Sequence, residues 1–180
     1  MISNFHRSVE ILVLAIALTG LISNIAAKDA NAQTIEPNSE KQINSKPKGY
    51  FGVGGAIGLG GNSTALSTGG LSLFTKTVFS ENLALHSSTV IFGSNIAVST
   101  SALTFNLPIR NEVEQIIFTP FFGGGVMFSN EGGLKTSPHI TGGLDVPLSP
   151  RLTGTIRMNL GFMSDRPTES GLVLGVGYSF

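Results

Sequence analysis

The sequence predicts an all-β fold, an eight-stranded antiparallel up-and-down transmembrane β-barrel preceded by a cleaved signal peptide and a short disordered linker. Three observations support this prediction. Residues 171–180 alternate large apolar residues with small ones up to the C-terminus. Residues 49–180 divide into eight apolar-rich segments separated by turn-forming residues. Charged residues make up only 12% of the chain and glycine contributes 23 residues, which disfavours helical bundles and favours closely packed strands.

Residues 1–32 have the pattern of a secretory signal peptide. A weakly basic start precedes an apolar run over residues 11–25, and a small-x-small cleavage pattern ends at Ala32. Cleavage after Ala27 is an alternative. A retained membrane helix is a rival interpretation, but the apolar run is shorter than the ~20 residues that a span needs. We therefore expect export through the secretory pathway.

Two segments follow the predicted cleavage site. Residues 33–48 are polar and lack periodicity, so we interpret them as a disordered linker on the periplasmic side. Residues 49–180 form one domain, long enough for roughly eight strands of about ten residues with their turns. The formal charge is zero, which indicates neither a nucleic-acid footprint nor a polybasic membrane patch. The absence of cysteine from the sequence excludes a disulfide framework and a lipoprotein-type acylation site.

Turn-forming residues set the bounds of the eight predicted strands. The intervening segments contain Gly, Asn, Ser or Pro, which supply turn geometry or hydrogen bonds from side chain to backbone. An even number of strands with both chain ends on one side is what an eight-stranded barrel requires. The predicted strands are residues 50–59, 67–79, 83–92, 96–107, 115–128, 137–148, 152–163 and 171–180.

Glycine clusters occupy the start of the domain and the fifth predicted strand, at residues 52–55, 58–61 and 123–125. Glycine-rich phosphate-binding loops lead into the N-terminus of a helix, and no helical pattern follows these clusters. Glycines on the inner wall of a barrel instead let bulky neighbours fill a narrow lumen. We therefore assign these clusters to packing.

The second and third predicted strands are joined by Ser80-Glu81-Asn82. A three-residue hairpin loop there places Phe79 opposite Leu83 and Lys76 opposite His86. The apolar residues of both strands then face outward, and Lys76 and His86 face the lumen.

The face assignment of residues 87–102 stays open at this point. The register across residues 93–95 puts four hydroxyl residues on the outer face and Val90 and Val98 inside. Either this part stands above the hydrocarbon, or β-bulges exchange the two faces. The four hydroxyl residues are Ser87, Thr89, Ser99 and Ser101.

The sixth and seventh predicted strands separate most clearly into two faces. A three-residue loop at 149–151 pairs Leu148 with Leu152, and places Asp145 and Arg157 as diagonal neighbours on the inner face, about 7–8 Å apart at the backbone. A long arginine side chain spans that gap, so we expect a charge-assisted pair. The predicted inner face comprises His139, Thr141, Gly143, Asp145, Thr153, Thr155, Arg157 and Asn159.

The candidate site is therefore a polar network that closes the lumen. Its predicted members are Lys76, His86, His139, Asp145 and Arg157, and Thr141, Thr153 and Asn159 are expected to satisfy the remaining groups. The alternative is that the charges lie near the rim, hydrated and uncoupled. We expect no metal site and no cofactor, because no Cys/His cluster or paired-carboxylate spacing is present.

One pair of residues could also be interpreted as part of a catalytic site. His86 and Ser88 share a face, and a His-x-Ser pair resembles the site of the outer-membrane lipid A deacylases. The glutamate that such a site needs does not follow on the next strand, and the register points His86 into the lumen, where an acyl chain does not reach. We expect a structural histidine and no catalytic residue.

The C-terminal strand resembles the signature of bacterial outer-membrane β-barrels, which end in alternating apolar residues closed by a terminal Phe, here Tyr178 and Phe180. Residues 118–126 and 145–152 are similar to the mid-barrel strand and the last periplasmic turn of the OmpA-like and OmpX-like domains and the generic outer-membrane β-barrel domain family. The resemblance implies a protein of the outer membrane of a Gram-negative-type bacterium, in contact with outer-membrane lipids. It also implies that the assembly machinery reads the last strand.

The architecture leaves the activity open, because small barrels host several kinds of function. A structural or surface-interaction role of a monomer with a closed polar lumen is our first expectation, with no nucleic-acid partner. A small pore or a lipid-modifying enzyme is the alternative. A soluble periplasmic ligand-binding barrel is a third.

Overall fold

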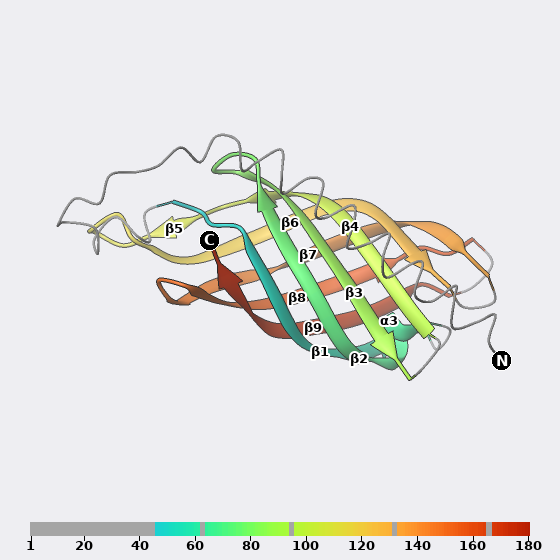
Figure 1. Cartoon of the computed structure of the whole chain (residues 1–180). Helices are drawn as coiled ribbons and strands as arrows, with labels where there is room; N and C mark the ends of the chain where they lie inside the picture. Colours follow the sequence, from blue (N-terminus) through green and yellow to red (C-terminus); the bar gives the residue numbers. More distant parts are fainter. Residues whose placement is uncertain (1–45, 62–63, 94–95, 131–132, 165–166) are drawn as a thin grey trace.

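The described part of the chain is an antiparallel barrel whose wall has eight strands (Figure 1). Each strand pairs with its neighbours in sequence, and a pairing between the first and last wall strands closes the barrel. This confirms the predicted all-β fold class and its eight-stranded topology. The wall strands are β1 (Tyr50–Gly60), β2 (Gly70–Val78), β3 (Leu83–Phe92), β4 (Ile96–Asn106), β6 (Ile116–Ser129), β7 (Lys135–Ser149), β8 (Leu152–Gly161) and β9 (Glu169–Ser179).

The structure is a computed structural model. The predicted signal peptide (1–32) and all but the last three residues of the predicted linker (33–48) lie outside the described residues, as do parts of four predicted turns. The described residues are 46–61, 64–93, 96–130, 133–164 and 167–180.

Both ends of the barrel domain lie at one end of the barrel, which we call the termini end. There Tyr50 at the start of β1 pairs with Ser179 at the end of β9. Figure 1 shows the C-terminus at this end and the short helix α3 (Ala65–Thr68) at the other, which we call the α3 end. An up-and-down barrel with an even number of strands produces this arrangement.

The helix α3 was not predicted, because residues 67–79 were assigned to one strand. Thr64 caps the helix: its side-chain oxygen accepts a hydrogen bond from the backbone N–H of Leu66, and Ser67 completes a capping box. Gly69 and Gly70 follow with φ angles of 85° and 155°, which favour glycine and turn the chain into β2. The second strand therefore begins three residues later than predicted.

A second difference lies at the termini end, where residues 108–112 were predicted as a turn. Ile109 and Arg110 form a short strand, β5 (Ile109–Arg110), which pairs with the start of β6 and is not part of the barrel wall. The resulting hairpin projects beyond the barrel in Figure 1. Arg110 forms one ion pair with Glu114 within the hairpin and another with Glu81, which fixes the hairpin to the β2–β3 turn.

The predicted register of β2 and β3 is confirmed. Lys76 lies opposite His86, and the backbone N–H of Phe79 donates to the carbonyl of Leu83 at 2.9 Å. Lys76 and His86 therefore face the lumen as predicted, but the expectation that the apolar residues of both strands face outward is wrong for Phe74 and Ala84, which share the inward parity and are buried.

The register of β7 and β8 is confirmed in the wall but is wrong at the turn. Leu144 pairs with Ile156 as predicted, whereas Leu152 pairs with Ser149 and not with Leu148, because the register shifts between Pro147 and Ser149. The bulge leaves Leu148 unpaired on the outer surface, where its side chain lies beside Gly154.

Candidate functional site

Five polar side chains meet inside the barrel, in the half nearer the termini end, and we call them the central cluster. Each is at most 3% exposed. They converge because side chains alternate between the two faces of a strand, and each lies at an inward position. The central cluster consists of Tyr50 on β1, Lys76 on β2, Asp145 on β7, and Thr155 and Arg157 on β8.

Asp145 receives hydrogen bonds from three strands. The Lys76 ammonium lies 2.9 Å from Oδ2, and the hydroxyls of Tyr50 and Thr155 each lie 2.7 Å from Oδ1. Lys76 projects from β2, directly across the lumen from β7 in the strand order. Charge-assisted hydrogen bonds of this kind compensate for the removal of both charges from water.

Arg157 is bound by neutral acceptors and aromatic rings. Its guanidinium donates to the Tyr50 hydroxyl at 2.7 Å, to the carbonyl of Ser87 at 3.2 Å and to the Thr155 hydroxyl at 3.3 Å. The guanidinium carbon lies 4.9 Å from the ring centroid of Phe74 and 6.0 Å from that of Phe121. Cation–π attraction is strongest where water is excluded, as it is here.

The predicted direct pair between Asp145 and Arg157 does not form. Among the described residues the only ion pair in the lumen joins Lys76 and Asp145. The Tyr50 hydroxyl lies between Asp145 and Arg157 and contacts both. The prediction considered neighbouring strands alone, whereas the lumen of an eight-stranded barrel is narrow enough for side chains to reach across it.

Tyr50 is the member of the site that sequence reasoning missed. A signal was present, because Phe51 and Val53 are large apolar residues and the alternation they begin makes Tyr50 an inward residue. The structure places Phe51 and Val53 on the outer surface, each more than half exposed. An inward tyrosine at the first position of a barrel strand is thus readable from the pattern.

His86 lies in the lumen, as the hairpin register predicts, but it makes no hydrogen bond to the central cluster. Its ring packs 4.1 Å from the ring of Phe121 and 6.4 Å from that of Tyr50, measured between centroids. Neither ring nitrogen has a hydrogen-bond partner among the described residues. Its expected role as a donor in the network is therefore not observed.

His139 belongs to a second polar group, closer to the α3 end. Its Nε2 lies 3.1 Å from the side-chain oxygen of Asn159, which also accepts from the Thr141 hydroxyl at 3.0 Å. Thr153, at the termini end, instead pairs with the hydroxyl of Ser179 at 2.7 Å. The one predicted network is thus divided into separate groups among the described residues.

Apolar side chains and α3 fill the lumen toward the α3 end. Leu66 of α3 is fully buried and packs with buried residues of the wall strands. The Thr64 hydroxyl donates to the carboxylate of Glu169 on β9 at 3.0 Å, which ties the helix to the wall. The wall residues in this apolar group are Ala56, Val90, Val98, Met127 and Val173.

Glycines of the inner wall make room for the large side chains, as the sequence predicts. A side chain added at Gly52 or Gly175 would collide with the ring of Phe74, and one at Gly143 would lie 2.7 Å from Phe121. The Phe74 ring therefore occupies the volume that side chains at Gly52 and Gly175 would fill.

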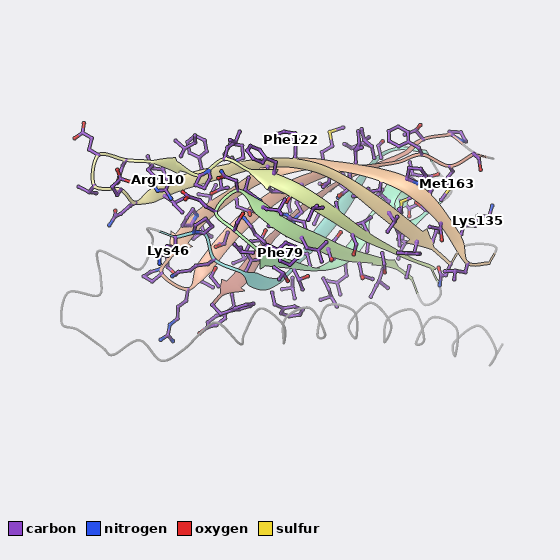
Figure 2. All side chains as sticks on the ribbon, turned by 90° about the horizontal axis from the view of Figure 1, so that it is seen from above. Lys46, Phe79, Arg110, Phe122, Lys135 and Met163 are labelled. Carbon is purple, nitrogen blue, oxygen red and sulfur yellow. The ribbon has the colours of Figure 1, made fainter. Side chains whose placement is uncertain are left out.

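Every wall strand carries apolar side chains on its outer surface, and β3 and β4 also carry hydroxyl residues there. Side chains such as Leu71, Leu103, Phe122, Ile140 and Leu174 are each at least 37% exposed, while the charged residues of the wall point inward. Figure 2 shows Phe122 on the outside of the barrel, with Lys46 and Arg110 at one end and Lys135 at the other. Charges are thus confined to the lumen and the two ends in this part of the chain.

The open question about residues 87–102 is settled by the β3–β4 register, which runs without a shift. Val90 and Val98 face inward and are fully buried, so bulges do not exchange the faces. The outward hydroxyls bind in cross-strand pairs, Ser87 with Ser101 at 2.9 Å and Thr89 with Ser99 at 3.0 Å. Polar groups outside the barrel are thereby satisfied within the sheet.

The C-terminal strand closes the barrel against β1. Tyr178 lies on the outer surface, and the backbone N–H of Phe180 donates to the carbonyl of Gly49 at 3.1 Å. A side chain at Gly49 would lie 3.0 Å from the Phe180 ring, so the aromatic ring covers the start of the barrel.

The described residues contain no group of three or more His, Cys, Asp or Glu side chains suited to hold a metal ion. In the same part of the chain, no helix has the length and apolar character needed to cross a membrane.

Comparisons with known proteins bear on the fold. No family model and no curated protein matches the sequence. A designed transmembrane β-barrel is similar over 74% of this chain and 94% of its own, with 13% identity and a TM-score of 0.52. The N-terminal β-barrel domain of Pseudomonas aeruginosa OprF is similar over 75% and 98%, with 12% identity and a TM-score of 0.51.

The attachment invasion locus protein Ail of Yersinia pestis covers 75% of this chain and 99% of its own, with 16% identity and a TM-score of 0.48. At these identities the likeness concerns architecture alone. The likeness to the two structures with TM-scores above 0.5, together with the strand topology, leads to one conclusion: the chain has the fold of the small eight-stranded outer-membrane β-barrels.

Proposed function

We propose that the chain is an integral outer-membrane protein of a Gram-negative-type bacterium, exported through the secretory pathway, with a structural or surface-interaction role. The observation that carries this proposal is the reversed distribution of side chains. Apolar side chains are exposed on the outside of every wall strand, the outward hydroxyls of β3 and β4 bind one another, and Lys76, Asp145 and Arg157 are buried inside. Water would disfavour such an exposed apolar surface, whereas hydrocarbon favours it.

The lumen is proposed to be closed to ions and solutes. The central cluster spans the interior with side chains from β1, β2, β7 and β8, and the apolar group below α3 fills the rest. An interior of this width is filled by side chains in small barrels.

The resemblance of the last strand to outer-membrane barrels supports the remaining assignments. The termini end would face the periplasm, and Tyr178 and Phe180 would be read by the assembly machinery. Lipids of the outer membrane would contact the apolar wall. We propose a monomer, because the sheet closes on itself and, among the described residues, its wall has no free strand edge.

The alternative roles have weaker support. His86 and Ser88 both face the lumen and are buried, so a lipid acyl chain on the outer wall does not reach them. We therefore propose no enzymatic activity and no cofactor. A pore would need a path past the Lys76–Asp145 ion pair and Arg157, and the steady conductance of a planar bilayer containing the protein would reveal one.

Heat modifiability tests the proposal. Membrane fractions from expressing cells are dissolved in detergent and run on a gel with and without boiling, beside a soluble periplasmic protein as control. A folded barrel is expected in the urea-resistant membrane fraction and to migrate differently before and after boiling. Recovery of the protein in the soluble periplasmic fraction, with one mobility, would overturn the proposal.

A further inference from the structure

A narrow cleft opens at the termini end of the barrel, directly beside the central cluster. It has a volume of about 40 Å³ and reaches from the surface to the side chains of Lys76 and Asp145. Lys46 and Lys48, which precede β1, line its mouth, and Tyr50 lines its floor. Figure 2 shows Lys46 at this end of the barrel, close to Arg110 in the view.

The cleft has an excess of positive charge. Three lysines line it, Lys46, Lys48 and Lys76, and the only carboxylate among its lining residues is Asp145. Asp145 already accepts hydrogen bonds from Lys76, Tyr50 and Thr155. Lys46 and Lys48 form no ion pair with any described residue, and the Lys48 ammonium donates instead to the carbonyl of Pro150 at 2.8 Å.

A fourth cation adds to this field from the β7–β8 turn. Burial, and then the positive charge of Arg151, lower the pKa of Lys48 below its ordinary value. Both effects disfavour the charged ammonium, and a bound anion would oppose them. The cleft therefore has the positive electrostatic potential of an anion site. The net positive charge of Lys76, Asp145 and Arg157, which lie behind the cleft, increases this potential.

We propose that this cleft binds a phosphate-class oxyanion, held by the ammonium groups of Lys46 and Lys48 at its mouth and of Lys76 at its floor. Lysine is a compact point charge with three rotatable donors, which suits a tetrahedral oxyanion approached from several sides. The volume fits one such group, and it is far below the roughly 300–1,000 Å³ of drug-sized ligand sites. The headgroup of a phospholipid in the adjacent leaflet and a soluble phosphate are the two sources of that chemistry.

The test uses the full folded chain in maltoside micelles, which contain no phosphate. Inorganic phosphate is titrated by calorimetry at constant ionic strength, with sodium chloride as the balancing salt. We expect saturable binding to the wild type and a loss of roughly ten-fold in affinity for each of Lys46→Gln and Lys48→Gln, the scale of one charge-assisted hydrogen bond. Lys135→Gln, at the α3 end, is the charge-matched control and should bind as the wild type does.

Both substituted lysines precede β1 and lie outside the barrel wall, so the variants are expected to fold, and heat modifiability checks this. A second titration adds phosphatidylglycerol to the micelles. If the lipid binds saturably, competes with phosphate and no longer binds to the Lys46→Gln/Lys48→Gln variant, the phospholipid headgroup is the source. If the lipid leaves phosphate binding unchanged, the ligand is a soluble anion. The absence of saturable binding, or equal binding by the double variant, would overturn the site.

Discussion

The Tyr50 hydroxyl donates a hydrogen bond to Asp145 and lies 2.7 Å from its carboxylate, although 95 residues separate the two in sequence. The same hydroxyl accepts a hydrogen bond from Arg157. One side chain on the first strand therefore connects the carboxylate of β7 to the guanidinium of β8. The first strand of the barrel is joined to two late strands through the lumen as well as through its pairing with β9.

Removal of that hydroxyl should destabilise the barrel. Tyr50→Phe leaves an acceptor on Asp145 and a donor on Arg157 without their shared partner, and we expect a cost of about 1–3 kcal/mol in the free energy of unfolding. Tyr178→Phe, on the exposed outer face, is the matched control and should change stability by less than about 0.5 kcal/mol. Urea unfolding in lipid vesicles measures both, and equal stability of the two variants would count against the central cluster as described.

Lys76 should contribute more than Arg157 to the stabilisation of the buried Asp145 carboxylate. Lys76→Met alone leaves a buried carboxylate with no countercharge in contact, at a cost of about 3–5 kcal/mol. A double-mutant cycle that combines Lys76→Met with Asp145→Asn should give an interaction energy of about 0.5–3 kcal/mol. The parallel cycle that combines Arg157→Met with Asp145→Asn should give a smaller interaction energy. A larger coupling for Arg157 would mean that it, and not Lys76, pairs with the carboxylate.

The glycines of β1 should respond to substitution according to their faces. Gly52→Ala drives a methyl group into the Phe74 ring, and such overpacking costs roughly 1–3 kcal/mol. Gly55→Ala meets no atom within 4 Å and should be neutral or stabilising. Unfolding free energies of the two variants provide the comparison, and a reversed order would show that the faces of β1 are misassigned.

Deletion of Phe180 should reduce assembly. The residue bonds to Gly49 through its backbone and covers the start of β1, and its type matches the terminal residue of outer-membrane barrels. We expect a smaller heat-modifiable fraction in the membrane while export and signal cleavage proceed. Phe79→Ala, which removes another exposed aromatic side chain at the same end of the barrel, is the control. Full assembly of the truncated chain would contradict this role.

The sequence predicts the wall of this barrel well because strand alternation is local. The Lys76–His86 and Leu144–Ile156 pairings follow from loop length and from the apolar positions alone. The differences arise where a tertiary contact overrides a local pattern. Residues 67 and 68 were assigned to a strand, but they belong to α3, whose Leu66 is buried inside the barrel, and a register shift beside Leu148 replaces the predicted three-residue loop.

The structure places the five predicted site residues in the lumen, and the contacts between them differ from those expected. The strand register decides which alternate side chains point inward, and it places all five in the lumen: Lys76, His86, His139, Asp145 and Arg157. Which groups bond to each other depends on the reach of side chains across the barrel, and sequence spacing carries no such information. Lys76 on β2 thus contacts Asp145 on β7, and His86 packs against Phe121 without a hydrogen bond.

The most direct test of a membrane barrel with a closed lumen uses its lack of native cysteine. Single variants Thr155→Cys, Ile156→Cys and Ser80→Cys are assembled in vesicles and exposed to a small charged thiol reagent and to a membrane-partitioning maleimide. The structure predicts that the lumen position 155 reacts with neither, the wall position 156 with the maleimide alone, and the exposed turn position 80 with the charged reagent. Reaction of the charged reagent at position 155 as fast as at position 80 would show an open lumen, and its reaction at position 156 would show a wall that faces water.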